Sequence, residues 1–167
     1  MRSATAIVGS AIFFVIAPGT VAGFVPWWLS RWQFQPCWEP LRAIGVVLIL
    51  AGLPGLLDSF RRFALDGLGT PAPVAPPARL VVTGLYRHVR NPMYLSILTV
   101  ILGQAALLGD WRLVGYATVL ALAFHLFVIA YEEPALKLSF GAEFAAYRAN
   151  VPRWLPRLNP WRPGTTS

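Results

Sequence analysis

The sequence predicts an all-α integral membrane protein with about four transmembrane helices and a C-terminal amphipathic helix on the cytoplasmic face. The 167-residue chain is 56% hydrophobic and only 13% charged, and its mean hydropathy is +0.58. A water-soluble domain of this length needs more charged side chains to cover its surface. We therefore interpret residues 1–167 as a single membrane domain.

The first two helices are expected within residues 1–60. Residues 3–30 carry no charge, and this apolar run is longer than the core of a secretory signal, so it is predicted to be a retained transmembrane helix. Pro18 and Gly19 should kink it. The second apolar run extends from Leu41 to about Leu57, where Pro54-Gly55 predicts an irregular end.

The last two helices are expected within residues 93–131. One apolar run lies between Arg90 and Asp110, and the other lies between Arg112 and Glu132. Each approaches the ~20 residues that a helix needs to cross a bilayer.

Residues 61–92 are rich in proline and glycine and form the predicted cytoplasmic loop. One interpretation is a linker between two halves of the protein. The other is a binding site for a polar or anionic ligand, because polar side chains gather just before the third helix. These residues are Gly84, Tyr86, Arg87, Arg90, Asn91, Pro92 and Tyr94.

Residues 132–167 are predicted to form a cytoplasmic amphipathic helix followed by a tail. From Ala135 to Arg148, large apolar residues recur every three to four positions, as on one face of a helix. The basic tail that follows, with Trp154, is either part of a site or a simple interfacial anchor.

Basic residues orient the chain. Eleven of the 14 lysines and arginines fall in the N-terminus, the 61–92 loop and the tail, and three fall on the opposite side. The positive-inside rule therefore places both termini in the cytoplasm and Cys37 outside.

The arginines are spread between apolar runs instead of forming one stripe, so no nucleic-acid partner is expected. A lone cysteine also excludes a thiolate metal cluster, and no metal site is predicted.

Two motifs near the membrane face resemble the isoprenylcysteine carboxyl methyltransferases and the related phospholipid methyltransferases. The first is Leu80-Val81-Val82-Thr83-Gly84-Leu85-Tyr86-Arg87-His88-Val89-Arg90-Asn91-Pro92-Met93-Tyr94. The second is Glu132-Glu133-x-x-Leu136-x-x-x-Phe140-Gly141-x-x-Phe144-x-x-Tyr147, followed by Val151-Pro152-Arg153. The resemblance implies S-adenosylmethionine as the cofactor, bound from the cytoplasmic side. The implied cofactor-binding residues are Leu80, Val81, Tyr86, Asn91, Pro92, Met93, Tyr94 and Glu132.

The chain departs from this family pattern at two positions. Asn91 stands where the family usually has histidine, which keeps a hydrogen-bonding side chain but removes a titratable one. Val128 stands where prenylcysteine enzymes place an arginine for the substrate carboxylate. Val128 and Arg153 are the candidate substrate-binding residues, and a neutral or weakly ionised acceptor is expected.

Glu132 and His125 are the candidate catalytic residues. Glu132 would accept hydrogen bonds from the cofactor, or else it marks only the end of the fourth helix. His125 lies seven residues earlier, on the same face of a regular helix. It would hydrogen-bond or deprotonate the acceptor, or it would be a buried neutral histidine satisfied by Gln104.

Three functions are compatible with these residues. The leading hypothesis is an S-adenosylmethionine-dependent membrane methyltransferase acting on a lipophilic or lipid-modified acceptor at the cytoplasmic membrane face. The alternatives are a membrane reductase on a similar helical scaffold and a non-catalytic membrane subunit. The methylated atom, whether oxygen, nitrogen or sulfur, and the oligomeric state stay open.

Overall fold

A computed structural model describes residues 16–65 and 79–162, and every regular element in these ranges is helical. The predicted helical class is confirmed for this part of the chain. Two helices, Glu39–Arg62 and Trp111–Asn150, are long and apolar enough to cross a membrane by length and composition, and Pro92–Leu108 is apolar but shorter. Residues 66–78 of the predicted loop and residues 3–15 of the first apolar run lie outside the described residues. The count of four crossings stays a prediction.

The first described helix is irregular where the sequence predicts a disturbance. Chain from residue 16 onward is helical, and the π-helical turn η1 (Thr20–Phe24) follows directly after Pro18 and Gly19. Helix α2 (Val25–Ser30) then ends at Arg31, whose φ is 51°. Proline lacks an N–H and disturbs the regular hydrogen-bond ladder, so a local change of helix type at this point is expected.

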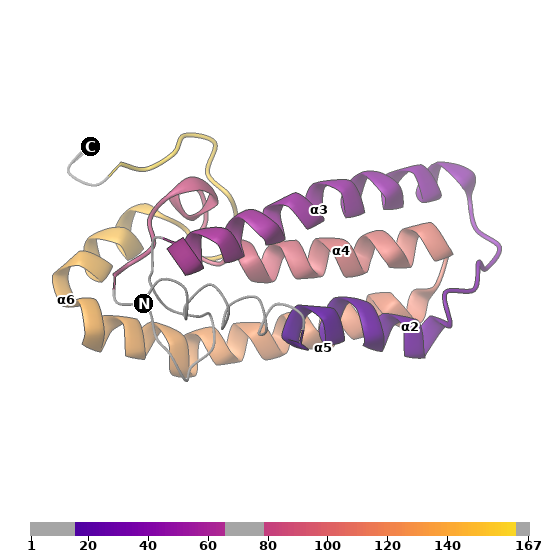
Figure 1. Cartoon of the computed structure of the whole chain (residues 1–167), viewed down its shortest axis with the longest axis horizontal. Helices are drawn as coiled ribbons and strands as arrows, with labels where there is room; N and C mark the ends of the chain where they lie inside the picture. The colour runs from indigo at the N-terminus through magenta and orange to yellow at the C-terminus, as the bar shows by residue number, and fades with distance from the viewer. Residues whose placement is uncertain (1–15, 66–78, 163–167) are drawn as a thin grey trace.

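Helices α3 (Glu39–Leu65) and α4 (Pro92–Leu108) lie side by side and form the main packed pair of the bundle (Figure 1). Their backbones approach closely at glycines. A Cβ on Gly45 would come within 2.6 Å of the carbonyl oxygen of Gly103, and a Cβ on Gly103 would come within 2.9 Å of the carbonyl oxygen of Gly45. A Cβ on Gly52 would meet a methyl group of Val100 at 2.7 Å. We call Gly45, Gly52 and Gly103 the glycine seam.

The predicted irregular end at Pro54-Gly55 is wrong, because α3 continues through both residues to Leu65. Packing explains the continuation. Gly55 faces α4 so closely that a Cβ would meet Oγ of Ser96 at 2.7 Å. The hydroxyl of Ser59 donates to the Gly55 carbonyl at 2.8 Å. Contacts along the helix pair outweigh the one backbone bond that proline removes, as is common in membrane helices.

The fourth apolar run and the predicted amphipathic helix form one long helical segment. Helix α5 (Trp111–Phe127), the π-helical turn η3 (Val128–Glu132) and α6 (Glu133–Asn150) follow one another without a loop (Figure 1). The backbone leaves helical geometry inside α6 at Gly141, with φ 47° and ψ −116°. The chain therefore turns at this glycine, and a separate helix beginning near Ala135 is not observed.

The bundle has two different ends. At one end, which we call the tryptophan end, the segment before α3 meets the α4–α5 turn, where the backbone N–H of Gln35 donates to the carbonyl of Leu108 at 2.7 Å. Hydrogen bonds from Arg112 hold the pKa of the Asp110 carboxyl in this turn below its usual value. Exposed indoles surround this end: Trp27, Trp28, Trp32, Trp38 and Trp111. The opposite end, which we call the motif end, comprises residues 79–91, α6 and the tail 151–162 (Figure 1).

Candidate functional site

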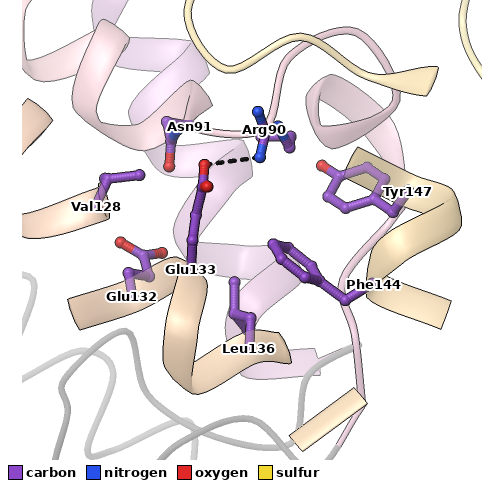
Figure 2. A pocket seen from close by; sticks show the side chains of 8 residues that line it. All are labelled: Arg90, Asn91, Val128, Glu132, Glu133, Leu136, Phe144 and Tyr147. Carbon is purple, nitrogen blue, oxygen red and sulfur yellow. Dashed lines mark hydrogen bonds and ion pairs between the residues drawn. The ribbon is translucent and has the colours of Figure 1, made fainter. Parts of the chain in front are cut away.

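A pocket at the motif end lies between the start of α4 and the η3–α6 segment. Its described lining brings together one residue of the loop, the α4 cap, the π-turn and α6. The lining residues are Arg90, Asn91, Val128, Glu132, Glu133, Leu136, Phe144 and Tyr147 (Figure 2). Apolar side chains and four polar or charged ones thus face a common space, which is the usual character of a ligand site.

The π-turn η3 sets which side chains face the pocket. Val128 and Glu132, four residues apart, both line it, as the helical spacing predicts. Val128 is only 1% exposed and forms an apolar wall. A π-turn changes the angular phase of the helix relative to a regular α-helix. His125 precedes this turn and is not among the described residues that line this pocket, so its place beside a bound acceptor stays a prediction.

Glu132 is held by one phenol. The Tyr94 hydroxyl donates to Oε2 of Glu132 at 3.0 Å, and the Tyr94 ring stacks on Phe124 with centroids 4.5 Å apart. The stacked ring fixes the direction of the hydroxyl, because the phenol can turn little without losing this contact. Glu132 is therefore oriented towards the pocket while it keeps unused acceptor capacity for a ligand.

Glu133 is the centre of a buried ion cluster. Arg90 Nη1 donates to its Oε1 at 2.7 Å (Figure 2). Arg153 donates to both carboxylate oxygens at 2.7 and 3.0 Å. Arg148 approaches at 3.9 Å. The Glu133 side chain is 9% exposed and that of Arg90 is 11% exposed. The cluster joins the first motif, the second motif and the tail, so it fixes the pocket wall.

The arginines of this cluster differ in their surroundings. Burial lowers the pKa of Arg90, which Glu133 only partly offsets. The hydrogen bond to Glu133 raises the pKa of Arg153. Because arginine pKa values start so high, both guanidinium groups stay charged at neutral pH. The Nε of Arg90 is buried without a hydrogen-bond partner within the described residues, which leaves one donor of the pocket wall unused.

Backbone hydrogen bonds connect the tail (residues 151–162) to the loop residues before α4. The N–H of Arg90 donates to the carbonyl of Pro152, and the N–H of Arg157 donates to the carbonyl of His88, both at 2.9 Å. The Asn91 side-chain amide donates to the carbonyl of Arg153 at 3.2 Å. These bonds hold the loop in one conformation beside the pocket, so the tail is part of the site's scaffold.

Phenols add to this scaffold. The hydroxyl of Tyr147 donates to the carbonyl of Tyr86 at 2.7 Å. Burial raises the pKa of Tyr86 well above its usual value, so this phenol stays neutral. Tyr147 packs with Phe144 and Val151 in a small apolar cluster beneath the loop.

The structure separates the residues predicted from the sequence into two groups. Three of them line the pocket, namely Asn91, Val128 and Glu132, and Tyr94 bonds to Glu132. The others have packing positions in the described chain. Leu80 packs against the Phe144 cluster, Met93 lies in the bundle core, and Val81, Tyr86 and Pro92 are buried.

His125 and Arg153 have partners that the sequence does not reveal. The indole N–H of Trp154 donates to Nδ1 of His125 at 3.0 Å. Gln104 instead donates to the carbonyl of Ala22 at 2.7 Å, so the alternative in which Gln104 satisfies His125 is wrong. Arg153, a candidate for substrate binding, bonds to Glu133. These hydrogen bonds join residues 20 or more positions apart in the sequence, so tertiary packing determines them.

Arg90, which the sequence places in a candidate site for a polar or anionic ligand, lines the pocket. Four other lining residues were given no site role from the sequence, namely Glu133, Leu136, Phe144 and Tyr147. A signal for them exists, because all four belong to the second motif quoted above. The candidate catalytic residues from the sequence include Glu132 and not Glu133, whereas both residues line the pocket (Figure 2).

Comparison with known proteins identifies the family. The family model described as phospholipid methyltransferase matches residues 41–143, which span α3 through the first part of α6 and most of the pocket lining. No curated protein and no solved structure matches the chain. The family match covers more than half of the chain and includes both apolar helices that are long enough to cross a membrane. The chain therefore belongs to the phospholipid methyltransferase family of membrane methyltransferases.

Proposed function

We propose that this protein transfers a methyl group from S-adenosylmethionine to a lipophilic acceptor at the cytoplasmic face of the membrane. The observation that supports this most is the pocket in which Asn91 and Glu132, from two distant motifs, face the same space. Both residues belong to the segment that matches the methyltransferase family. A structural role alone does not require a carboxylate with spare acceptor capacity beside an apolar wall.

The pocket residues fit the chemistry of this cofactor. Glu132 accepts from Tyr94 through Oε2 and has acceptor capacity left for hydroxyl or ammonium groups. The unpartnered Nε of Arg90 is a donor in the wall that can hydrogen-bond an oxygen of the cofactor, while Glu133 neutralises the guanidinium charge. The aromatic rings of Phe144 and Tyr147 offer faces that attract a positively charged sulfonium. These side chains would hold different ends of the cofactor.

The protein's contribution is mainly to bind and orient. When bound, S-adenosylmethionine supplies an activated methyl group on a sulfonium, which a nucleophile displaces in line. Glu132 would anchor the cofactor, and its fixed direction through Tyr94 would keep the two reactants aligned. The apolar wall at Val128 would keep water from the reacting atoms.

The pocket favours a neutral or weakly ionised acceptor. Val128 is apolar and 1% exposed where a prenylcysteine enzyme would carry an arginine. Arg153 and Arg90 are engaged with Glu133, so neither is free to neutralise an acceptor carboxylate without giving up that pair. We expect faster methylation of phosphatidylethanolamine vesicles, in which the reacting atom is an amine nitrogen and no carboxylate is methylated, than of a farnesylated cysteine analogue. Preferred turnover of the prenylcysteine would contradict this acceptor assignment.

The same proposal implies an orientation of the chain in the membrane, in which the motif end lies in the cytoplasm. Exposed indoles surround the tryptophan end, as expected at a membrane interface, and most basic residues gather at the other end. Cys37 should react with an impermeant maleimide added outside intact cells. Ser139→Cys, on exposed α6 in a Cys37→Ser background, should not. The reverse labelling pattern would overturn the orientation.

Calorimetric titration of the detergent-solubilised chain tests the cofactor. We expect S-adenosylhomocysteine to bind and a nicotinamide dinucleotide not to bind. Glu132→Gln should weaken the affinity about tenfold or more, because charge-assisted hydrogen bonds contribute ~1.5 to 3 kcal/mol. Glu143→Gln, which changes an exposed carboxylate on α6, is the matched control. Binding of the nicotinamide cofactor alone would favour a reductase.

A further inference from the structure

The two histidines of the chain are held in opposite ways. Nδ1 of His88 bonds to the carbonyl oxygen of Arg157 at 2.8 Å, and Nδ1 of His125 bonds to the indole nitrogen of Trp154 at 3.0 Å. A carbonyl oxygen only accepts, so His88 must carry its proton on Nδ1. An indole N–H only donates, so Nδ1 of His125 must be unprotonated and its proton lies on Nε2. The partners therefore determine both neutral tautomers.

From this geometry we propose that His125 is a hydrogen-bond donor to the methyl acceptor through Nε2 and does not act as a base. Its one basic lone pair is occupied by Trp154, so taking up a proton at Nδ1 requires loss of that bond. The other ring nitrogen already carries a hydrogen and offers no lone pair. Trp154 is thus a positioning residue that selects the tautomer of His125. This inference rests on the proposed methyl transfer.

The location of His125 supports a ligand as the missing partner. His125 is half-buried within the apolar segment Trp111–Asn150, three residues before Val128 of the pocket wall. Within residues 16–65 and 79–162, its hydrogen bonding consists of the contact from Trp154. An N–H without a partner in an apolar membrane setting is costly. An oxygen of the acceptor, such as an ester carbonyl or a phosphate oxygen, satisfies it.

The assignment also restricts the chemistry of the acceptor. If His125 cannot remove a proton, the acceptor atom must reach the site with its lone pair already available. An amine that has lost its ammonium proton to water before the transfer meets this condition, and the N–H of His125 would hold a neighbouring oxygen so that the lone pair points at the methyl group. In the transfer, a bond forms from the acceptor atom to the methyl carbon while the carbon–sulfur bond breaks. Its electron pair stays on sulfur, giving S-adenosylhomocysteine.

Nitrogen NMR of the full chain in lipid nanodiscs, with only the histidine rings labelled with ¹⁵N, tests the tautomers without any turnover. We expect one ring protonated on Nδ1 and the other on Nε2, with His88→Gln and His125→Gln assigning the two signals. Trp154→Phe should remove the hydrogen bond at Nδ1 of His125, which shifts that nitrogen resonance and raises the Nδ1–H population, and it should leave the His88 signal unchanged. A wild-type His125 ring with its proton on Nδ1, or one unaffected by Trp154→Phe, overturns the proposal.

Turnover of phosphatidylethanolamine vesicles with tritiated S-adenosylmethionine separates a donor from a base. The side-chain amide nitrogen of His125→Gln can replace the Nε2 donor, so KM should stay within about threefold, whereas His125→Leu should raise KM about tenfold. Equal and large losses of kcat in both variants would indicate a base and overturn the proposal. An unchanged KM in both variants would also overturn it.

If the wild-type protein is inactive on these vesicles but active on the farnesylated cysteine analogue, the same two variants are compared on that acceptor. A wild type that binds no S-adenosylhomocysteine overturns the proposed function and the donor role, while the NMR result still decides the tautomer.

Discussion

The glycine seam and the motif end of this protein are held together by different forces. Along the seam, α3 and α4 touch through Gly45, Gly52 and Gly103, where the absence of side chains lets the backbones meet. At the motif end, Glu133 joins two arginines and the tail bonds to the loop. The packing at the glycine seam depends on the absence of side chains, whereas the structure of the motif end depends on the identity and direction of polar groups. Each half should therefore respond to a different kind of substitution.

Removing the central carboxylate of the motif end should have the largest effect on stability. Glu133→Ala leaves the buried guanidinium of Arg90 and that of Arg153 without their shared partner. We expect the free energy of unfolding in detergent to fall by about 3 kcal/mol, as when one member of a buried ion pair is removed. The exposed Glu143→Ala is the control and should change little. Equal stability of the two variants would show that the cluster is only a surface network.

Adding one methyl group to the glycine seam should have the next largest effect. A Cβ at Gly45 meets the backbone of α4, which cannot move aside as a side chain can. We expect Gly45→Ala to lower the free energy of unfolding by about 2 kcal/mol. Gly115→Ala on α5, where a Cβ meets nothing within 4 Å, should be neutral or slightly stabilising. A stable Gly45→Ala variant would mean that the helix pair is less tightly packed than described.

A single phenol hydrogen bond between α6 and the loop sharpens the comparison at the motif end. Tyr147→Phe removes the bond to the Tyr86 carbonyl and keeps the ring in its buried cluster. We expect a loss of about 1 kcal/mol and faster hydrogen exchange in the loop around Tyr86. Tyr131→Phe, an exposed residue on the same long helix, is the control. Unchanged exchange in the loop would contradict the role of Tyr147 as its anchor.

The smallest expected effect is on cofactor affinity and not on folding. Tyr94→Phe leaves the stacking on Phe124 but releases the Glu132 carboxylate. We expect S-adenosylhomocysteine affinity to fall about fivefold, the size of one ordinary hydrogen bond. Tyr116→Phe breaks a phenol bond to the carbonyl of Val21, away from the pocket, and should leave the affinity unchanged. If both variants bind equally well, Tyr94 does not position Glu132 for the cofactor.

These comparisons show why the sequence predicts some features of the site and misses others. The two motifs identify Asn91, Glu132 and Tyr94 as neighbours, and the structure brings them together. The spacing argument treats the fourth helix as regular, whereas a π-turn follows His125 at Val128–Glu132, and His125 is not among the described lining residues. It also undervalues Glu133, whose partners lie more than 40 residues before it and 20 residues after it. No local pattern encodes contacts over such distances.

The sequence by itself determined the helical membrane class and the two motifs, because apolar run length and motif spacing are local properties of the chain. Tertiary structure decided the rest. Helix α3 continues through Pro54 to Leu65, because its packing on α4 outweighs the tendency of proline to end a helix. Tertiary structure assigned Gly45 to a contact within the chain, which small-residue spacing leaves undecided. It also placed the indole N–H of Trp154 within hydrogen-bond distance of His125, because a polar side chain in an apolar setting bonds to the polar partner that packing brings close.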